Sequence, residues 1–173
     1  MKLKLLALSL LILPTITVPN QAQELPSATD ITAAEIDAFI DALPQDQISD
    51  RAIRVVDVGG YNAGVFGVFR PSSEPGRAIR HDTPVSEIYY MLAGTGVLVT
   101  GGTIDNEVST GNSRLTGQPN YAGSGISGGV TRTVVPGDVI VIPGNTPHWW
   151  QSLETDIRYL IFRPDPESML QLK

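Results

Sequence analysis

The chain has 173 residues, contains no cysteine and carries a formal net charge of −6. A chain of this length forms one domain with short extensions, and the absence of cysteine excludes a disulfide framework and thiol chemistry. The acidic balance, without a cluster of basic residues, argues against nucleic-acid binding and against charge-driven binding to a membrane surface. We therefore expect a single domain that is stabilised by its apolar core.

The first 22 residues have the pattern of a secretory signal peptide. Lys2 and Lys4 form a short positive region, and residues 5–18 form an apolar run. That run is shorter than the roughly 20 residues of a membrane-spanning helix and suits a signal-peptide core. We predict cleavage near Ala22 and a periplasmic or secreted mature protein with no membrane contact; the alternative is a retained membrane anchor.

A short amphipathic helix is predicted within an N-terminal extension of residues 23–51. Thr32 and Glu35 have the spacing of a capping box, in which each side chain accepts a hydrogen bond from a free backbone N–H at the start of a helix. Apolar residues then recur at the spacing of one helical face, at Ile36, Phe39, Ile40 and Leu43. Pro44 ends the pattern, and we expect this helix to cover apolar surface of the domain that follows.

From residue 52 to residue 164 the pattern changes to short runs rich in valine, isoleucine and aromatic residues. Glycine, proline, asparagine and aspartate separate these runs, which is typical of an all-β sandwich or barrel. We predict strands at 52–58, 63–69, 86–92, 96–100, 130–135, 138–143, 148–153 and 157–162. Residues 101–129 are rich in glycine, serine, asparagine and threonine, and we predict a long loop there that is functional or disordered. Residues 165–173 are a C-terminal tail.

The chain has only two histidines, and each lies in a segment with a distinctive spacing. The first segment has a histidine, a glutamate six places later and a glycine seven places after that, at His81, Glu87 and Gly94. The second has a glycine, a proline six places later and a histidine five places after the proline, at Gly137, Pro143 and His148.

These two segments resemble the paired motifs of the cupin superfamily. The resemblance covers about residues 52–164 and implies a double-stranded β-helix, the jelly-roll barrel of that family, with the two motifs on neighbouring strands. It also implies a metal site built from His81, Glu87 and His148. The chain departs from the family pattern at Thr83, where a second histidine is usual, and at Asn145, where glycine is usual.

Strand geometry predicts which other side chains lie beside these three residues. Side chains alternate between the two faces of a strand, so residues two apart share a face. We therefore predict that four further residues line the same pocket or support its ligands: Thr83, Tyr89, Met91 and Trp150. The alternative for the aromatic and methionine side chains is ordinary core packing.

Two imidazoles and one carboxylate with open positions are the donor set of many non-haem Fe(II) sites, and the same donors accept other divalent metals. We expect a divalent metal, with its identity open among Fe, Mn, Zn, Ni and Co. The alternative is a metal-free pocket in which the buried histidine and glutamate hydrogen-bond each other. In that case Glu87 becomes the candidate general base, so it is the predicted catalytic residue in either case.

Two function hypotheses follow. The first is a metal-dependent enzyme for a small organic molecule, since the cupin resemblance implies dioxygenase, isomerase or lyase chemistry. The second is a binding protein that holds a sugar or organic acid without metal. In both cases the partner is a small-molecule ligand, and the resemblance together with the need to cover sheet edges implies a homodimer.

The last predicted strand carries two arginines of opposite parity, Arg158 and Arg163. Because they are five residues apart, at most one of them can face the barrel interior. An arginine that faces inward would indicate a carboxylate-bearing ligand.

Overall fold

The computed structural model describes residues 27–173, so the predicted signal peptide lies outside the described residues. Helix α1 spans Ala33–Asp41. The capping box is confirmed: the Thr32 N–H donates to Glu35 Oε2 at 2.8 Å, and the Glu35 N–H donates to Thr32 Oγ1 at 3.2 Å. Among residues 27–173, no helix is long and apolar enough to span a membrane.

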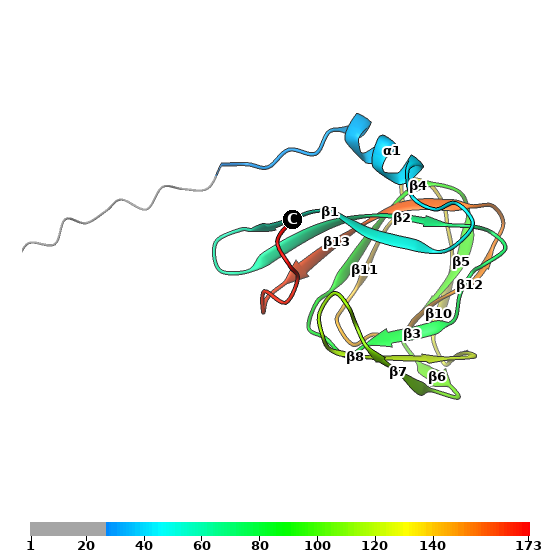
Figure 1. Cartoon of the computed structure of the whole chain (residues 1–173). Coiled ribbons are helices and arrows are strands. Elements are labelled where there is room, and N and C mark those ends of the chain that lie inside the picture. The colour runs from blue at the N-terminus through cyan, green and yellow to red at the C-terminus, as the bar shows by residue number, and fades with distance from the viewer. Residues whose placement is uncertain (1–26) are drawn as a thin grey trace, which may run out of the picture.

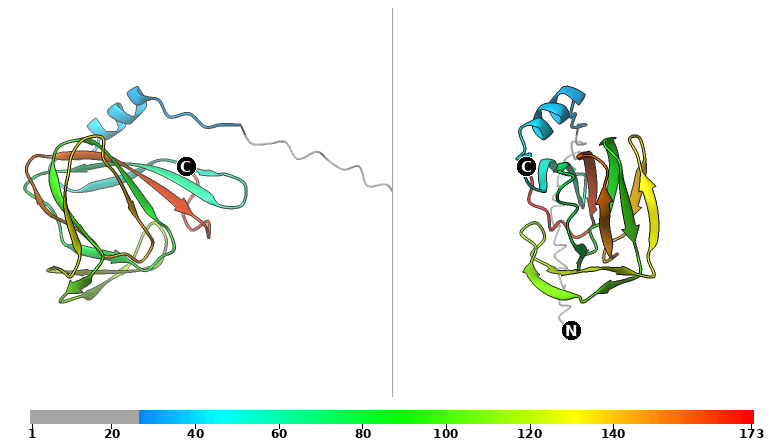
Figure 2. Two further views of the ribbon diagram at one scale, coloured as in Figure 1. Left: turned by 180° about the vertical axis from the view of Figure 1, so that it is seen from behind. Right: turned by 90° about the vertical axis from the view of Figure 1, so that its right-hand side faces the viewer.

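Two antiparallel sheets form the barrel (Figures 1 and 2). The first has the order β1-β2-β13-β4-β11, with bounds Ser49–Asp57, Asn62–Arg70, Ile157–Asp165, Glu87–Ala93 and Val139–Ile142. The second has the order β10-β5-β12-β3-β8-β7, with bounds Val130–Val134, Gly96–Thr100, His148–Leu153, Ala78–His81, Pro119–Gly123 and Val108–Asn112. This architecture confirms the predicted all-β double-stranded β-helix with one short helix.

All eight predicted strands are present, and the first and last are longer than expected. Strand β1 begins at Ser49, inside the predicted N-terminal extension. The sequence pattern placed the start of this strand later, because its first residues are polar and break the apolar pattern. After β13 the chain turns back to β1, where the Val55 N–H donates to the Lys173 carbonyl at 3.1 Å and the Lys173 N–H donates to the Val55 carbonyl at 3.0 Å. The C-terminal tail is therefore held against the first sheet.

The prediction of a long loop at residues 101–129 is wrong, because four short strands lie there. Strands β7 and β8 join the second sheet, while β6 (Thr103–Asp105) and β9 (Gly125–Ser127) pair with each other. Strand β8 also pairs with β3. Strand β3 was not among the strands predicted from the sequence. Strand β7 was missed because it is exposed at every position, and the other three strands were missed because they are only three to five residues long.

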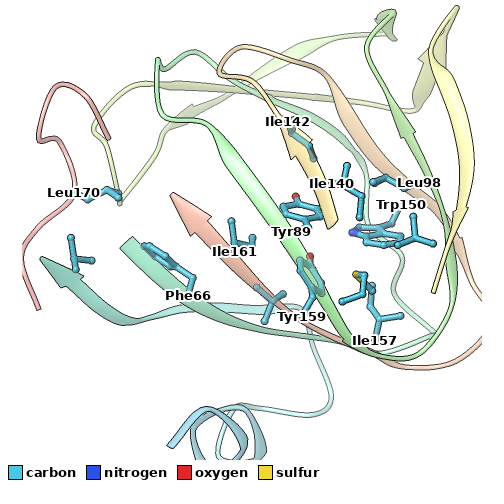
Figure 3. Close-up of a cluster of buried hydrophobic side chains, with 14 residues drawn as sticks. Phe66, Tyr89, Leu98, Ile140, Ile142, Trp150, Ile157, Tyr159, Ile161 and Leu170 are labelled. Atoms are coloured by element: carbon cyan, nitrogen blue, oxygen red, sulfur yellow. The ribbon is translucent and has the colours of Figure 1, made fainter. Parts of the chain in front are cut away.

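The apolar core lies between the two sheets and extends along the inner face of the first (Figure 3). A second apolar cluster lies on the outer face of the first sheet, under α1, and consists of Ile40, Leu43, Ile53, Phe69 and Leu160. Ile36 and Phe39 pack against this cluster. The predicted role of the helix as a cover for apolar surface is thus confirmed.

Two turn positions explain features of the motif segments. Gly94 has a φ of +83°, and a Cβ atom there would lie 2.1 Å from the carbonyl oxygen of Asp156, so only glycine fits. Asn145 has a φ of +63°. Asparagine tolerates this left-handed conformation better than most residues, which explains how it occupies a position where the cupin motif usually has glycine.

Candidate metal centre

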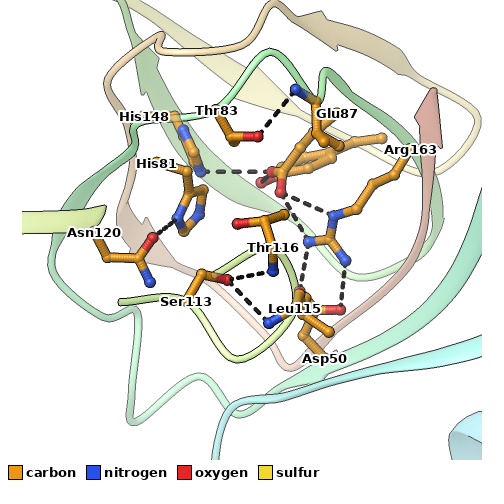
Figure 4. A network of polar contacts seen from close by, with 12 residues as sticks. Asp50, His81, Thr83, Glu87, Ser113, Leu115, Thr116, Asn120, His148 and Arg163 are labelled. Carbon is orange, nitrogen blue, oxygen red and sulfur yellow. Dashed lines mark hydrogen bonds and ion pairs between the residues drawn. The ribbon is translucent and has the colours of Figure 1, made fainter. Parts of the chain in front are cut away.

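The three candidate ligands meet at one end of the barrel, each at the end of a strand. His81 is the last residue of β3, and His148 is the first residue of the neighbouring β12. Glu87 is the first residue of β4 in the opposite sheet. One ligand atom from each residue lies within 4.8 Å of the other two, and the side chains converge as Figure 4 shows. The predicted convergence of two imidazoles and a carboxylate is present.

Hydrogen bonds at the outer ring nitrogens orient both imidazoles. Nδ1 of His81 lies 2.8 Å from Oδ1 of Asn120, and Nδ1 of His148 lies 3.0 Å from the carbonyl oxygen of Thr146. Both partners are acceptors, so each Nδ1 is the donor, and in the neutral form of each ring the lone pair is on Nε2. Oxygen partners of this kind fix the ring orientation and tautomer of histidines that bind metals.

Glu87 is a buried carboxylate whose two oxygens have separate partners. Oε1 accepts from Arg163, at 3.1 Å from Nε and 2.8 Å from Nη2. Oε2 accepts from the Tyr89 hydroxyl at 2.9 Å. Burial by itself raises the pKa of Glu87, but the charge of Arg163, together with His148 and His81 when these are protonated, outweighs burial and lowers this pKa to about 2. The side chain is therefore ionised, and Oε2 retains a lone pair that points toward the histidines.

The donor set fits a cation. Burial lowers the pKa of His148, although the charge of Glu87 opposes this, and the lowered pKa favours the neutral ring. Its Nε2 is buried, has no hydrogen-bond partner within residues 27–173 and lies 3.6 Å from Glu87 Oε2. Two lone-pair atoms thus face each other in a buried site, an arrangement that is unfavourable without a positive charge between them. A divalent cation would satisfy both atoms together with Nε2 of His81.

Arg163 faces the barrel interior, while Arg158 faces outward and pairs with Asp41. The guanidinium of Arg163 binds Glu87 and also donates to both oxygens of Asp50, at 3.0 Å from Nη1 and 2.6 Å from Nη2. Its donors are therefore engaged by two carboxylates of the chain. The inward arginine positions Glu87 and keeps it ionised, so it does not by itself indicate a carboxylate-bearing ligand.

The four residues that were predicted to line the pocket or support its ligands lie in different environments. Tyr89 binds Glu87 and lines a cavity beside the ligands. Thr83 lies in the turn after β3, lines a second cavity and accepts a hydrogen bond from the Val85 N–H at 3.2 Å. Met91 and Trp150 belong to the apolar core. They share the predicted face, but each two-residue step moves a side chain about 7 Å further from the strand end that carries the ligand.

Two cavities of ligand size adjoin the candidate centre. All three candidate ligands line an interior cavity of about 150 Å³. His81 and Glu87 also line a larger cavity of about 320 Å³, whose far wall includes the turn between β7 and β8 at residues 113–116. Figure 4 shows Ser113, Leu115 and Thr116 on the side of the site opposite the ligands. The sequence did not predict a role for this turn or for Asn120.

No family model matches the chain, and no curated protein matches it in sequence. Solved structures resemble it in architecture. The DMSP lyase DddQ from Ruegeria pomeroyi is 20% identical, with 84% of this chain and 70% of that chain covered and a TM-score of 0.46. An RmlC-like cupin from Methanocaldococcus jannaschii is 10% identical, with coverages of 72% and 89% and a TM-score of 0.43. A Bacillus halodurans protein is 14% identical, with coverages of 85% and 89% and a TM-score of 0.48.

The order of the strands and the meeting of both motif segments at one end of the barrel define the fold of this protein. It has the cupin architecture, and its His81, Glu87 and His148 could hold a metal ion.

Proposed function

We propose that this protein is an exported cupin that binds one divalent metal through His81, Glu87 and His148 and acts on a small organic molecule. The observation that carries the proposal is the buried, unpartnered Nε2 of His148 opposite the ionised Glu87. The signal-like pattern of residues 1–22 supports export. When bound, the metal would supply Lewis acidity or activate oxygen, which are the usual roles of such ions.

The surrounding residues prepare the donor atoms. Asn120 and the Thr146 carbonyl hold the two imidazole rings with Nε2 directed inward. Arg163 holds Oε1 of Glu87 and leaves Oε2 toward the histidines. Burial and the charge of Glu87 raise the pKa of Tyr89 well above its usual value, so its hydroxyl stays protonated and donates to Oε2. The adjoining cavity of about 320 Å³ is large enough for a small organic substrate.

The second candidate function is a cupin that binds a small molecule without metal or turnover. Thr83 favours it, because the hydroxyl stands where a further imidazole is usual and is engaged in a local turn. The centre therefore has three side-chain ligands from its motifs rather than four. The two functions differ in metal dependence, since removal of metal abolishes catalysis by an enzyme of this kind but leaves the affinity of a simple binder unchanged.

Metal loading tests the proposal. We expect the purified mature protein, reconstituted separately with Fe(II), Mn, Co, Ni and Zn, to retain close to one equivalent of at least one metal after dialysis. Because the metal binds the folded state, a free concentration 100 times the dissociation constant raises the unfolding free energy by about 2.7 kcal/mol. Elemental analysis and thermal unfolding measure the two effects. Failure to retain any of the five metals would reject the metal-dependent function and favour the second candidate.

We further propose that the protein is a homodimer, which pairs through an apolar patch on the outer face of β11 and its neighbours. This patch consists of Val139, Val141, Tyr90 and Phe162, which are exposed to between 37% and 64%. Register places Val139 beside Tyr90 and Val141 beside Ile88. Strand β11 is also an edge of the first sheet, so its backbone is free to pair. Sedimentation at micromolar concentration should show a dimer, and Val141→Lys should shift it toward monomer; a monomeric wild type contradicts this.

A further inference from the structure

The cavity of about 320 Å³ beside the candidate metal centre has a neighbour of about 360 Å³ that shares part of its wall. Four residues line both cavities: Ala52, Arg114, Leu115 and Leu170. The shared wall comes from β1, from the turn between β7 and β8 and from the segment after β13. The second cavity therefore lies directly beside the first, on the side away from the candidate ligands.

The second cavity is lined mainly by apolar side chains. Val55 and Phe66 belong to the buried core cluster and form its floor, while Leu115, Leu170 and Leu172 complete the wall. Figure 3 shows Leu170 and Phe66 at the same end of the core. The C-terminal segment is held in place by the backbone pairing of Lys173 with Val55 and by the Leu170 N–H, which donates to Asp165 Oδ2 at 2.7 Å. This compartment suits an apolar group.

The first cavity is suited to an anionic group. Arg163 pairs with both Asp50 and Glu87, and the three side chains together carry one net negative charge. A divalent metal at the candidate centre would turn this into one net positive charge. Arg51 and Arg114 also line the cavity, and neither forms an ion pair with a carboxylate of residues 27–173. In a chain of formal net charge −6, two arginines without a carboxylate partner beside one cavity favour the binding of an anion.

We propose that the two cavities bind one elongated ligand, a small organic anion with an apolar chain. The anionic group lies in the first cavity, near the candidate metal centre and Arg114, and the chain extends past Leu115 into the second cavity. This assignment rests on the proposed function for the presence of the metal, while the two-compartment shape and the arginines are independent of it. A carboxylate and a phosphate monoester share the required head-group chemistry.

Straight-chain carboxylates of increasing length test the proposal. We expect the affinity of the full mature protein, measured by calorimetry with and without metal, to rise about fourfold per methylene until the second cavity is filled, because each buried methylene adds a constant increment of binding free energy. Primary alcohols and alkylammonium ions of equal length should bind at least tenfold more weakly. Alkyl phosphates form a parallel series, and the tighter series identifies the head group.

Two variants locate the parts of the ligand. Leu115→Asp should flatten the dependence on chain length, and the control Val130→Asp, at an exposed apolar position on β10, should leave it unchanged. Arg114→Gln should reduce the preference for the carboxylate over the alcohol, while Arg77→Gln, an exposed arginine that lines neither cavity, should not.

The outcomes separate this inference from the proposed function. An affinity in the wild type that does not depend on chain length, or an alcohol that binds as tightly as its carboxylate, overturns the inference even if the protein retains metal. A clear dependence on chain length with preference for the anion, in a protein that retains none of the five metals, supports the inference and rejects the metal-dependent function.

Discussion

Arg163→Met is expected to lower the free energy of unfolding by about 3–5 kcal/mol. The guanidinium is 5% exposed and pairs with Asp50 and Glu87 at the same time. Its removal leaves the Glu87 carboxylate buried without a compensating charge, and this uncompensated charge is the main cost. Methionine keeps most of the side-chain volume, but the cation–π contact with Phe66, whose ring centroid lies 4.2 Å from the guanidinium carbon, is lost as well. Urea unfolding of the metal-free protein measures the effect.

Arg158→Met is the matched control, because it lies on the same strand and pairs with the exposed Asp41. Exposed pairs of this kind contribute at most about 1 kcal/mol. The triple variant Arg163→Met, Asp50→Asn and Glu87→Gln should recover part of the lost stability, because no unpaired charge then remains in the interior. A loss for Arg163→Met no larger than that for Arg158→Met would show that Glu87 does not depend on this arginine.

His148→Ala is expected to raise the dissociation constant for the bound metal more than 100-fold. Residues that hold a metal ligand by hydrogen bonding contribute about 10–100-fold in affinity, and a direct ligand contributes more. Asn120→Ala should therefore fall within that range, because it removes the oxygen that orients His81. Thr83→Ala should change the constant less than tenfold, since its hydroxyl is engaged with the Val85 N–H.

Competition with a chelating dye measures the three constants, and far-UV circular dichroism checks that each variant is folded. The graded order His148→Ala, Asn120→Ala, Thr83→Ala is the specific expectation. Equal affinities for His148→Ala and the wild type would place the metal elsewhere, and a large loss for Thr83→Ala would assign this threonine a direct role at the metal.

The strands that form the barrel could be predicted because their apolar residues recur where one face is buried. In β11, for example, Ile140 and Ile142 are buried while Val139 and Val141 are exposed. The strands of residues 101–129 have no such signal. Strand β7 pairs with β8 and β6 with β9 inside this segment, and β8 also pairs with the distant β3. Strand β3 is only four residues long and pairs with β8 and β12.

The candidate ligands could be predicted because the chain has only two histidines and both have the spacing of a known motif. Their supporting residues could not. Asn120 is 39 residues from His81, and Asp50 is 113 residues from Arg163, so neither belongs to a local pattern. The odd spacing of Arg158 and Arg163 on the last strand predicted that at most one of them faces inward. Only the fold shows that this residue is Arg163 and that its partners are carboxylates of the chain.

The placement of the turn between β7 and β8 has a consequence for how such a protein diversifies. The candidate ligands are at the ends of β3, β4 and β12, whereas residues 113–116 form the opposite wall of the cavity from a hairpin at the margin of the second sheet. The candidate metal ligands and this wall of the cavity are thus encoded by separate parts of the gene. Mutation or a change of length in the hairpin can therefore alter the shape of the cavity while the three candidate ligands are inherited unchanged.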